Sequence, residues 1–132
     1  MTKNPTTCET QSPVVEAAQL MEREGVGSIP VCENGRLAGI VTDRDIAVRV
    51  VAGGRDPKQT RIQEVMTRDP ECVKADDSIE RALEVMESRQ VRRIPVIDGG
   101  GKLVGIIAQA DIARMGDDNA TGEMVEAISQ PQ

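Results

Sequence analysis

The chain of 132 residues contains no phenylalanine, tryptophan, tyrosine or histidine. Without aromatic rings it lacks the platforms on which single-stranded nucleic acids usually stack. Without histidine it lacks the side chain most often used for acid–base catalysis near neutral pH, and zinc sites based on histidine are excluded. Histidine-activated serine or cysteine nucleophiles are excluded for the same reason. We therefore expect a protein that is not an enzyme, requires no cofactor and has no metal site.

Positive net charge and long apolar runs are also missing. The formal net charge is −6, which opposes attraction to nucleic acids and to anionic lipids. No apolar stretch approaches the length of a membrane span, and no secretory segment is present. With 39% hydrophobic and 29% charged residues, the composition is typical of a globular domain. We expect a cytoplasmic protein with no membrane association, for which nucleic acid is a disfavoured partner.

One sequence pattern occurs twice along the chain. Three segments recur in the same order: MTKNP (1–5) as MTRDP (66–70), VGSIPV (26–31) as VRRIPV (91–96), and LAGIVTDRDIA (37–47) as LVGIIAQADIA (103–113). The offset is 65 residues for the first two segments and 66 for the third, because the second copy has one extra residue in its glycine turn. This ordered match over nearly the whole chain indicates an internal duplication.

Each copy predicts the same series of secondary-structure elements. A short extended stretch precedes an amphipathic helix with apolar residues at helical spacing: Val14, Ala17, Ala18 and Met21 in the first copy, and Ile79, Ala82, Leu83 and Met86 in the second. Ser12 and Asp77–Ser78 are the expected N-caps. Two aliphatic runs joined by turn residues follow, and then a second helix, which Gly53–Gly54 ends in the first copy.

The doubled pattern MT…P, IPV…G.L.GI and TDRDI resembles a tandem pair of CBS domains, the Bateman module, of the free-standing prokaryotic type. The resemblance implies an α+β fold of two βαββα repeats, related by a pseudo-twofold axis and packed through their sheets. We place the repeats at 1–54 and 66–116, with a linker and lead-in helix at 55–65. Residues 117–132 read as a polar loop and a short C-terminal helix capped by Thr121.

The resemblance also implies a function. Many members of this family bind adenosine-containing ligands (AMP, ADP, ATP, S-adenosylmethionine or NAD) in clefts between the repeats, and they usually form homodimers. We therefore expect a regulatory ligand-sensing module, a homodimer that signals to a partner protein not identified by the sequence. The alternative is a structural or redox-linked dimer of the same fold that binds no nucleotide.

The family's ribose signature is complete in the first copy. It comprises Gly39, two aliphatic residues, Thr42 and Asp45. The resemblance implies that the carboxylate accepts hydrogen bonds from both ribose hydroxyls, while the threonine contacts ribose or phosphate. The same Thr-x-x-Asp pattern is also typical of a helix capping box, which needs no ligand. The two roles are compatible, because a capping carboxylate can also face a cleft.

The second copy departs from this signature, because Ala108 replaces the threonine while Asp111 keeps the acid. Its site is therefore weaker, empty or differently selective. The second copy supplies cations instead, Arg92 and Arg93, where the first copy has glycine and serine. Resemblance to the family suggests that Arg93 reaches the ligand's phosphates. The alternative is a pair of solvated surface arginines.

A nucleotide base would have to lie among aliphatic side chains. The candidates are Val26, Ile29, Pro30 and Ile40. The same residues would be core in any fold, so this alternative stays open.

The three cysteines, Cys8, Cys32 and Cys72, show no metal-binding spacing. They are typical of small buried apolar residues in an intracellular protein. Cys8 and Cys32 fall in two expected strands of one repeat, which leaves a regulatory disulfide between them open, since spacing alone does not establish geometry.

Overall fold

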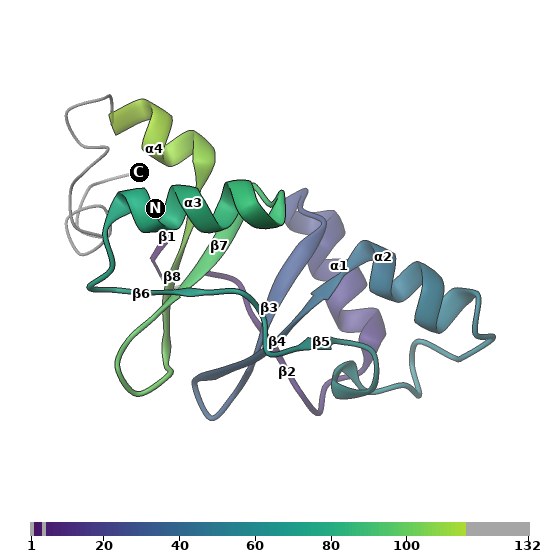
Figure 1. Ribbon diagram of the computed structural model, residues 1–132. Coiled ribbons are helices and arrows are strands. Elements are labelled where there is room, and N and C mark those ends of the chain that lie inside the picture. Colours follow the sequence, from purple (N-terminus) through teal and green to yellow (C-terminus); the bar gives the residue numbers. More distant parts are fainter. Residues whose placement is uncertain (1, 4, 116–132) are drawn as a thin grey trace. The chain divides into compact units, whose positions relative to one another are not determined.

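The computed structural model describes residues 2–3 and 5–115, which form two compact units. The first unit spans Thr6–Pro70, and the second combines the chain from Glu71 onward with the N-terminal residues before Thr6. Each unit has a four-stranded mixed sheet and helices, so the expected α+β class is confirmed (Figure 1). The helix expected after Thr121 lies outside the described residues.

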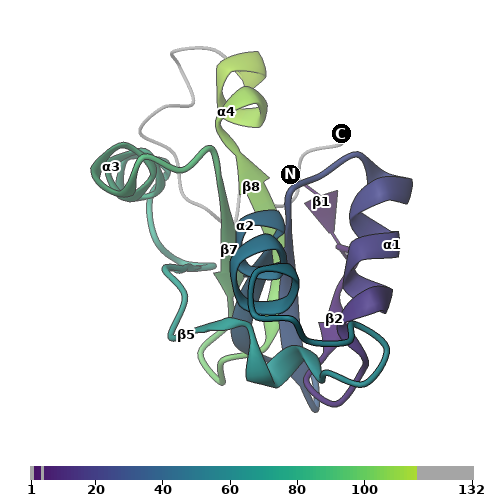
Figure 2. The ribbon, with the colours of Figure 1, turned by 90° about the vertical axis from the view of Figure 1, so that its right-hand side faces the viewer.

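The first unit contains four short strands, one long helix and a second helical region. In chain order these are β2 (Cys8–Glu9), α1 (Val14–Glu24), β3 (Ser28–Glu33), β4 (Arg36–Thr42), α2 (Asp43–Asp45), the π-helix η1 (Ile46–Val51), the 3-10 turn η2 (Ile62–Glu64) and β5 (Thr67–Arg68). The sheet order is β2-β3-β4-β5; β2 runs parallel to β3, and the other pairs are antiparallel. Helix α1 lies alongside this sheet and packs on β3 (Figure 2).

The second unit repeats this plan. Its elements are β6 (Val73–Lys74), α3 (Ile79–Arg89), β7 (Arg93–Ile97), β8 (Leu103–Ala108), α4 (Gln109–Met115) and the N-terminal strand β1 (Thr2–Lys3). The sheet order is β1-β8-β7-β6, with β6 parallel to β7. Helices α3 and α4 pack on β7 and β8 respectively and also contact each other.

The short strand that begins each sequence copy lies in the sheet of the other copy. Strand β1 pairs with β8, and β5 pairs with β4, at equivalent positions of the duplication: Thr2↔Ile106, Lys3↔Gly105, Thr67↔Ile40 and Arg68↔Gly39. The boundaries at 1–54 and 66–116 follow the sequence repeat, whereas the compact units exchange these edge strands. Each sheet therefore contains a two-residue edge strand from the other sequence copy.

The apolar spacing of the first helix is confirmed at three of its four positions, since α1 buries Val14, Ala17 and Met21, whereas Ala18 is half-buried. The expected cap at Ser12 is wrong. The N-cap is Pro13, which makes no side-chain cap bond. The N–H groups of Val14 and Val15 instead donate to the carbonyls of Thr60 and Pro57, at 2.8 and 3.0 Å. Because backbone from elsewhere in the unit satisfies these donors, no capping side chain is needed.

The equivalent helix of the second unit has the expected side-chain cap. Ser78 accepts a hydrogen bond from the N–H of Arg81 at 3.1 Å. Helix α3 buries Ile79, Ala82, Val85 and Met86 against the second core.

The two cysteines of the first sheet lie on opposite faces. Cys8 pairs with Val31, and Cys32 pairs with Glu9. Since paired residues share a face and successive residues alternate, Cys8 points with Val31 into the core under the helices, and Cys32 points to the other side. All three cysteines are free thiols. A Cys8–Cys32 disulfide would therefore require one strand to change its register.

Unfolding should become easier between pH 9 and 11, partly through Cys8. Burial, reinforced by Glu16, raises the pKa of the Cys8 thiol from about 9 to about 11. Below pH 9 the thiol is protonated in both states, but between pH 9 and 11 only the unfolded chain releases the proton, which favours unfolding. Urea titrations followed by circular dichroism from pH 8 to 11 should show this decline, uncomplicated by tyrosine ionisation.

The Cys8→Ala variant is the control for this decline. Its slope against pH should be smaller than that of the wild type, although part should remain because burial also raises the pKa of Cys32 and of Cys72. An unchanged slope in Cys8→Ala would contradict the assignment.

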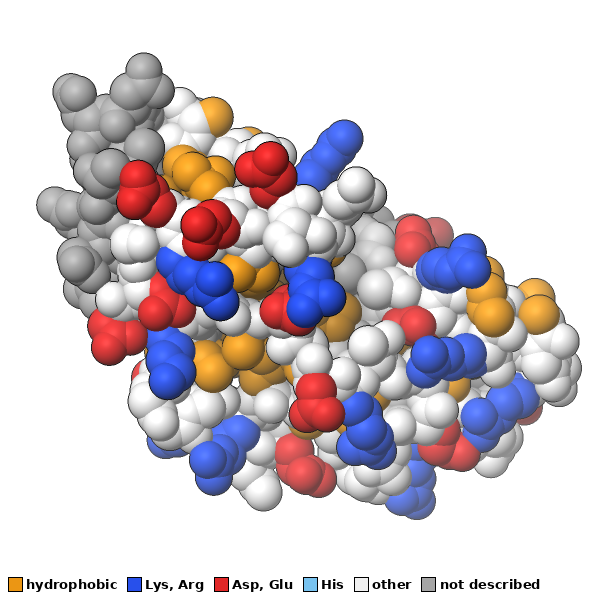
Figure 3. All heavy atoms as spheres, in the orientation of Figure 1, with side chains coloured by type: hydrophobic (Ala, Val, Ile, Leu, Met, Phe, Trp, Pro, Cys, Tyr) orange, Lys and Arg blue, Asp and Glu red, His pale blue; other side chains and the backbone are white. Residues whose placement is uncertain are grey.

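The surface carries charges of both signs. Figure 3 shows basic and acidic side chains intermixed on the face that it displays, without a continuous basic field among the described residues. Within residues 2–3 and 5–115, no helix combines the length and the apolar character needed to cross a membrane.

Candidate functional site

The signature residues of the first copy lie where β4 ends and α2 begins. The Asp45 N–H donates to Thr42 Oγ1 at 3.0 Å, and the Thr42 N–H donates to Asp45 Oδ2 at 2.9 Å. Thr42 has the extended backbone of an N-cap residue. The capping-box interpretation is therefore confirmed, and it accounts for both residue types without a ligand.

The cap leaves part of each side chain available. Asp45 is buried, with 9% of its surface exposed, yet only Oδ2 accepts a hydrogen bond from the described residues. Oδ1 forms an ion pair with Arg49, whose Nε lies 3.9 Å away. Oδ1 is also in contact with solvent, since no side-chain oxygen in the described residues is both fully buried and without a hydrogen bond. The Thr42 hydroxyl accepts one bond and keeps its own proton to donate. The site can thus accept and donate further hydrogen bonds.

The glycine of the signature has a packing role. A Cβ at Gly39 would lie 2.7 Å from the carbonyl oxygen of Thr67 and 2.8 Å from the sulfur of Met66. Strand β5 pairs with β4 at this position, so the backbone of the exchanged strand fills the space a side chain would take. Gly39 therefore allows β5 to dock beside the candidate ribose site.

The second copy forms half of the same arrangement. The Ala108 N–H donates to Asp111 Oδ2 at 3.0 Å, and Asp111 is 9% exposed, as Asp45 is. Ala108 has no hydroxyl that could accept a backbone hydrogen bond, as Thr42 does in the first copy. The helix start is otherwise built as in the first copy, because the Gln109 N–H donates to the Arg92 carbonyl at 2.8 Å. This site therefore keeps the carboxylate but lacks the threonine hydroxyl, which can both donate and accept a hydrogen bond.

The two candidate phosphate-binding arginines are exposed, and within the described residues neither guanidinium has an ion-pair partner. Arg93 pairs across the sheet with Ala108, the residue that replaces the threonine. Arg92 lines an open depression of about 450 Å³ between α3 and the start of α4, together with Leu83, Met86, Glu87, Gln90, Val91 and Gln109. Both cations therefore lie close to the Asp111 end of the second unit.

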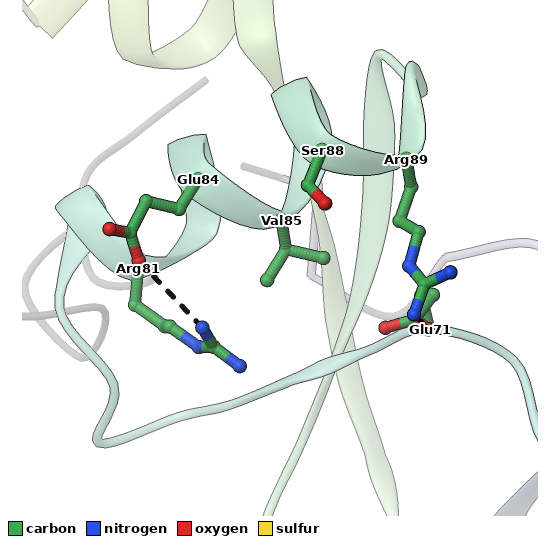
Figure 4. A pocket seen from close by; sticks show the side chains of 6 residues that line it. All are labelled: Glu71, Arg81, Glu84, Val85, Ser88 and Arg89. Carbon is green, nitrogen blue, oxygen red and sulfur yellow. Dashed lines mark ion pairs between the residues drawn. The ribbon is translucent and has the colours of Figure 1, made fainter.

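A second depression, of about 400 Å³, contains none of the candidate residues. Its lining comes from α3 and the stretch before β6 (Figure 4): Glu71, Arg81, Glu84, Val85, Ser88 and Arg89. Each of its arginines faces a carboxylate: Arg89 lies 2.8 Å from Glu71, and Arg81 lies 3.7 Å from Glu84. Because these cations are already paired, the depression is not a preformed phosphate site.

The four aliphatic candidates for a base do not share one surface. Ile29, 1% exposed, belongs to the core under the helices, and Val26 packs against that core. Pro30 pairs with Ile40 on the opposite face of the sheet, because side chains alternate along a strand. The structure therefore brings Pro30 and Ile40 together and separates them from Ile29.

Sequence reasoning missed Arg49. Its Nη1 donates to the carbonyls of Val65 and Met66 at 3.0 and 3.2 Å, while its Nε faces Asp45. The available signal was its position four residues after Asp45, where a helical ion pair is expected. No group of three or more potential metal-ligating side chains occurs in the described part of the chain.

Comparison with known proteins gives consistent matches. A sequence profile of the CBS domain matches residues 1–52 and 62–117. Hypoxic response protein 1 of Mycobacterium tuberculosis is 42% identical over 116 residues, which cover 87% of this chain and 80% of that protein. A crystal structure of Hypoxic Response Protein I with two coordinated zinc ions superposes with a TM-score of 0.79 at 39% identity, covering 89% of this chain and 95% of that one.

A second solved structure contains a nucleotide. The structure of CBSX2 in complex with AMP superposes with a TM-score of 0.71 at 25% identity, and the match covers 85% of this chain and 87% of that one.

Proposed function

The chain belongs to the CBS-domain family, and we propose that it is a regulatory module that binds an adenosine-containing nucleotide. The two matched segments correspond to the two copies of the duplication, so the chain carries a tandem CBS pair. The AMP complex of CBSX2 supports a nucleotide as the ligand class. The module would have no catalysis of its own, consistent with a chain that lacks histidine.

The observation that carries this proposal is that one carboxylate oxygen of Asp45, Oδ1, takes no part in the capping box. The capping box occupies Oδ2, and Oδ1 accepts no hydrogen bond from the described residues although it belongs to a buried carboxylate. An ionised carboxylate has about four acceptor positions, so Oδ1 can accept bonds from vicinal ribose hydroxyls while the cap persists. Such charge-assisted bonds are stronger than those between neutral groups.

The phosphate would be bound by Arg92 and Arg93, whose guanidinium groups are exposed and have no ion-pair partner among the described residues. Arginine suits this role because its fork of N–H donors matches phosphate oxygens. Pro30 and Ile40 are the aliphatic candidates that pair on one sheet face, and they are our candidates for contact with the base. Asp111 would hold a second, weaker ribose site.

Signalling would follow from ligand-dependent changes in a cytoplasmic homodimer, read by a partner protein. A ligand shifts such an equilibrium only by its difference in affinity between the two states. The partner's affinity should therefore differ between the nucleotide-bound and nucleotide-free forms.

A thermal-shift panel of AMP, ADP, ATP, S-adenosylmethionine and NAD tests the proposal. A ligand at a hundred times its Kd stabilises the folded state by about 2.7 kcal/mol, which raises the Tm of a chain of this size by about 10 °C. Adenosine is the control, since a smaller shift with adenosine than with AMP would assign a contribution to the phosphate. A folded protein whose Tm responds to no member of the panel would contradict the proposal.

The alternative is a structural CBS dimer that binds no nucleotide. It is favoured by the capping box, which explains Thr42 and Asp45 by themselves, and by the incomplete signature at Ala108. A redox-linked form has less support, because the register places Cys8 and Cys32 on opposite faces. The absence of any thermal shift would favour this alternative.

A further inference from the structure

Arg49 contacts two parts of the first unit that are far apart in sequence. Its guanidinium donates through Nη1 to the carbonyls of Val65 and Met66, at 3.0 and 3.2 Å. Its Nε lies 3.9 Å from Asp45 Oδ1, the oxygen left over by the capping box. A single side chain thus faces the candidate ribose carboxylate on one side and backbone carbonyls on the other.

The carbonyls belong to the stretch that leaves the first unit. We name Val65–Pro70 the connecting segment; it contains β5, ends the first unit at Pro70 and continues into Glu71. Strand β5 docks against Gly39 and Ile40, just before Thr42 in β4. The connecting segment is therefore attached to the candidate site at two points, the β4 ladder and Arg49.

The orientation of the Arg49 guanidinium depends on the charge of Asp45. At 3.9 Å the contact with Asp45 is an ion pair without a hydrogen bond, and half of the Arg49 side chain is exposed. The carboxylate orients the guanidinium mainly by charge, so neutralising it, or engaging Oδ1 with ribose hydroxyls, weakens that orientation. The bonds to the connecting segment should then weaken as well.

The second copy has no arginine at the sequence position equivalent to Arg49. The residue 66 positions after Arg49 is Met115, which carries no charge. The copy with the complete ribose signature is thus the copy with the arginine.

We propose that Arg49 is a positioning residue that transmits nucleotide binding at Asp45 to the connecting segment, by releasing it when Oδ1 is engaged. This inference rests on the proposed function and assigns a regulatory output to the same site. The output is a loosening of the connecting segment, the last residues of the first unit before the chain continues at Glu71.

Amide hydrogen exchange on the nucleotide-free full chain tests the coupling directly. Asp45→Asn keeps an acceptor for the cap but removes the charge, and Arg49→Met removes the cation. Each should accelerate exchange in the connecting segment about two- to fivefold, the size expected of a partly exposed ion pair. The double variant should exchange at the rate of Arg49→Met alone, because Asp45 acts on the segment only through Arg49, whose bonds to the segment are already lost.

Two further variants serve as controls. Arg44→Met removes a neighbouring exposed arginine of α2 and should leave the connecting segment unchanged. Arg49→Lys keeps a cation but has one nitrogen in place of the Nε that faces Asp45 and the Nη1 that binds the carbonyls, so it should give an intermediate rate. Additive effects of Asp45→Asn and Arg49→Met, or no effect of Arg49→Met on this segment, would overturn the inference.

The second arm adds the member of the nucleotide panel that gives the largest thermal shift. In the wild type it should accelerate exchange in the connecting segment while slowing exchange at the start of α2, where Thr42 and Asp45 close the capping box. In Arg49→Met the nucleotide should still bind, without acceleration in the segment; acceleration that persists would refute the role of Arg49. If no nucleotide binds the wild type, the proposed function fails, and the comparison of the wild type with the two single variants and the double variant still decides whether Asp45 and the segment are coupled.

Discussion

Asp45→Asn should weaken nucleotide binding about 30-fold, because a charge-assisted hydrogen-bond pair is replaced by a neutral one worth about 2 kcal/mol less. The asparagine oxygen can still accept from the Thr42 N–H, the bond that closes the capping box. Stability should therefore fall by no more than about 1 kcal/mol, the usual size of a lost charge at a helix N-terminus. Isothermal titration with the best member of the nucleotide panel measures the affinity, and urea unfolding measures the stability.

Two matched variants separate the ribose carboxylate from its neighbours. Asp43→Asn removes an exposed acid two residues away and should change affinity less than threefold, about the limit for an exposed charge. Asp111→Asn tests the incomplete copy and should have a smaller effect than Asp45→Asn, since Ala108 lacks the hydroxyl. Equal losses from Asp43→Asn and Asp45→Asn would assign the effect to general charge and reject Asp45 as the ribose ligand.

Gly39→Ala should destabilise the protein by about 2 kcal/mol, within the range for overpacking a rigid site. The new Cβ would lie 2.7 Å from the backbone oxygen of Thr67, and relieving that contact requires β5 to move away from β4. The sulfur of Met66, also close, can give way more easily than the backbone. Chemical denaturation should show a lower midpoint with little change in slope.

Gly99→Ala is the control for Gly39→Ala. A Cβ at Gly99 meets nothing within 4 Å, so stability should change by less than about 0.5 kcal/mol. A Gly39→Ala protein as stable as the wild type would show that β5 does not need the close approach. Nucleotide affinity is a second readout, because displaced β5 would disturb the β4 end that carries Thr42.

The internal duplication made much of the fold predictable. Helices α1 and α3 were predicted from apolar spacing, and the hairpins from turn residues between aliphatic runs. The capping box was readable because Thr-x-x-Asp acts within four residues. Such features are formed by residues that are close together in the sequence, so they can be predicted from the sequence alone.

The features that escaped prediction depend on contacts between distant residues. Two-residue strands such as β1 and β5 have no periodicity of their own, so their exchange was not visible. Ser12 looked like a cap because the carbonyls of Pro57 and Thr60, which take its place, lie far along the chain. Arg49 was missed for the same reason, since its partners Val65 and Met66 lie 16 and 17 residues further along the chain, between η2 and β5.

The second helix of the first copy also differs from the expected α-helix. Only Asp43–Asp45 is α-helical, and Ile46–Val51 continues as a π-helix, with the Ala52 N–H donating to the Ala47 carbonyl at 2.9 Å. Single π-turns often occur at functional positions, and this one contains Arg49.

The strand exchange has a consequence for synthesis on the ribosome. Residues Thr6–Pro70 are continuous in sequence, so the first unit has all its strands once Arg68 has emerged. Strand β1 is made first, yet its partner β8 starts only at Leu103, so β1 must wait for about a hundred residues of translation. The nascent chain should thus reach protease resistance in two steps, with the N-terminus protected only in the second.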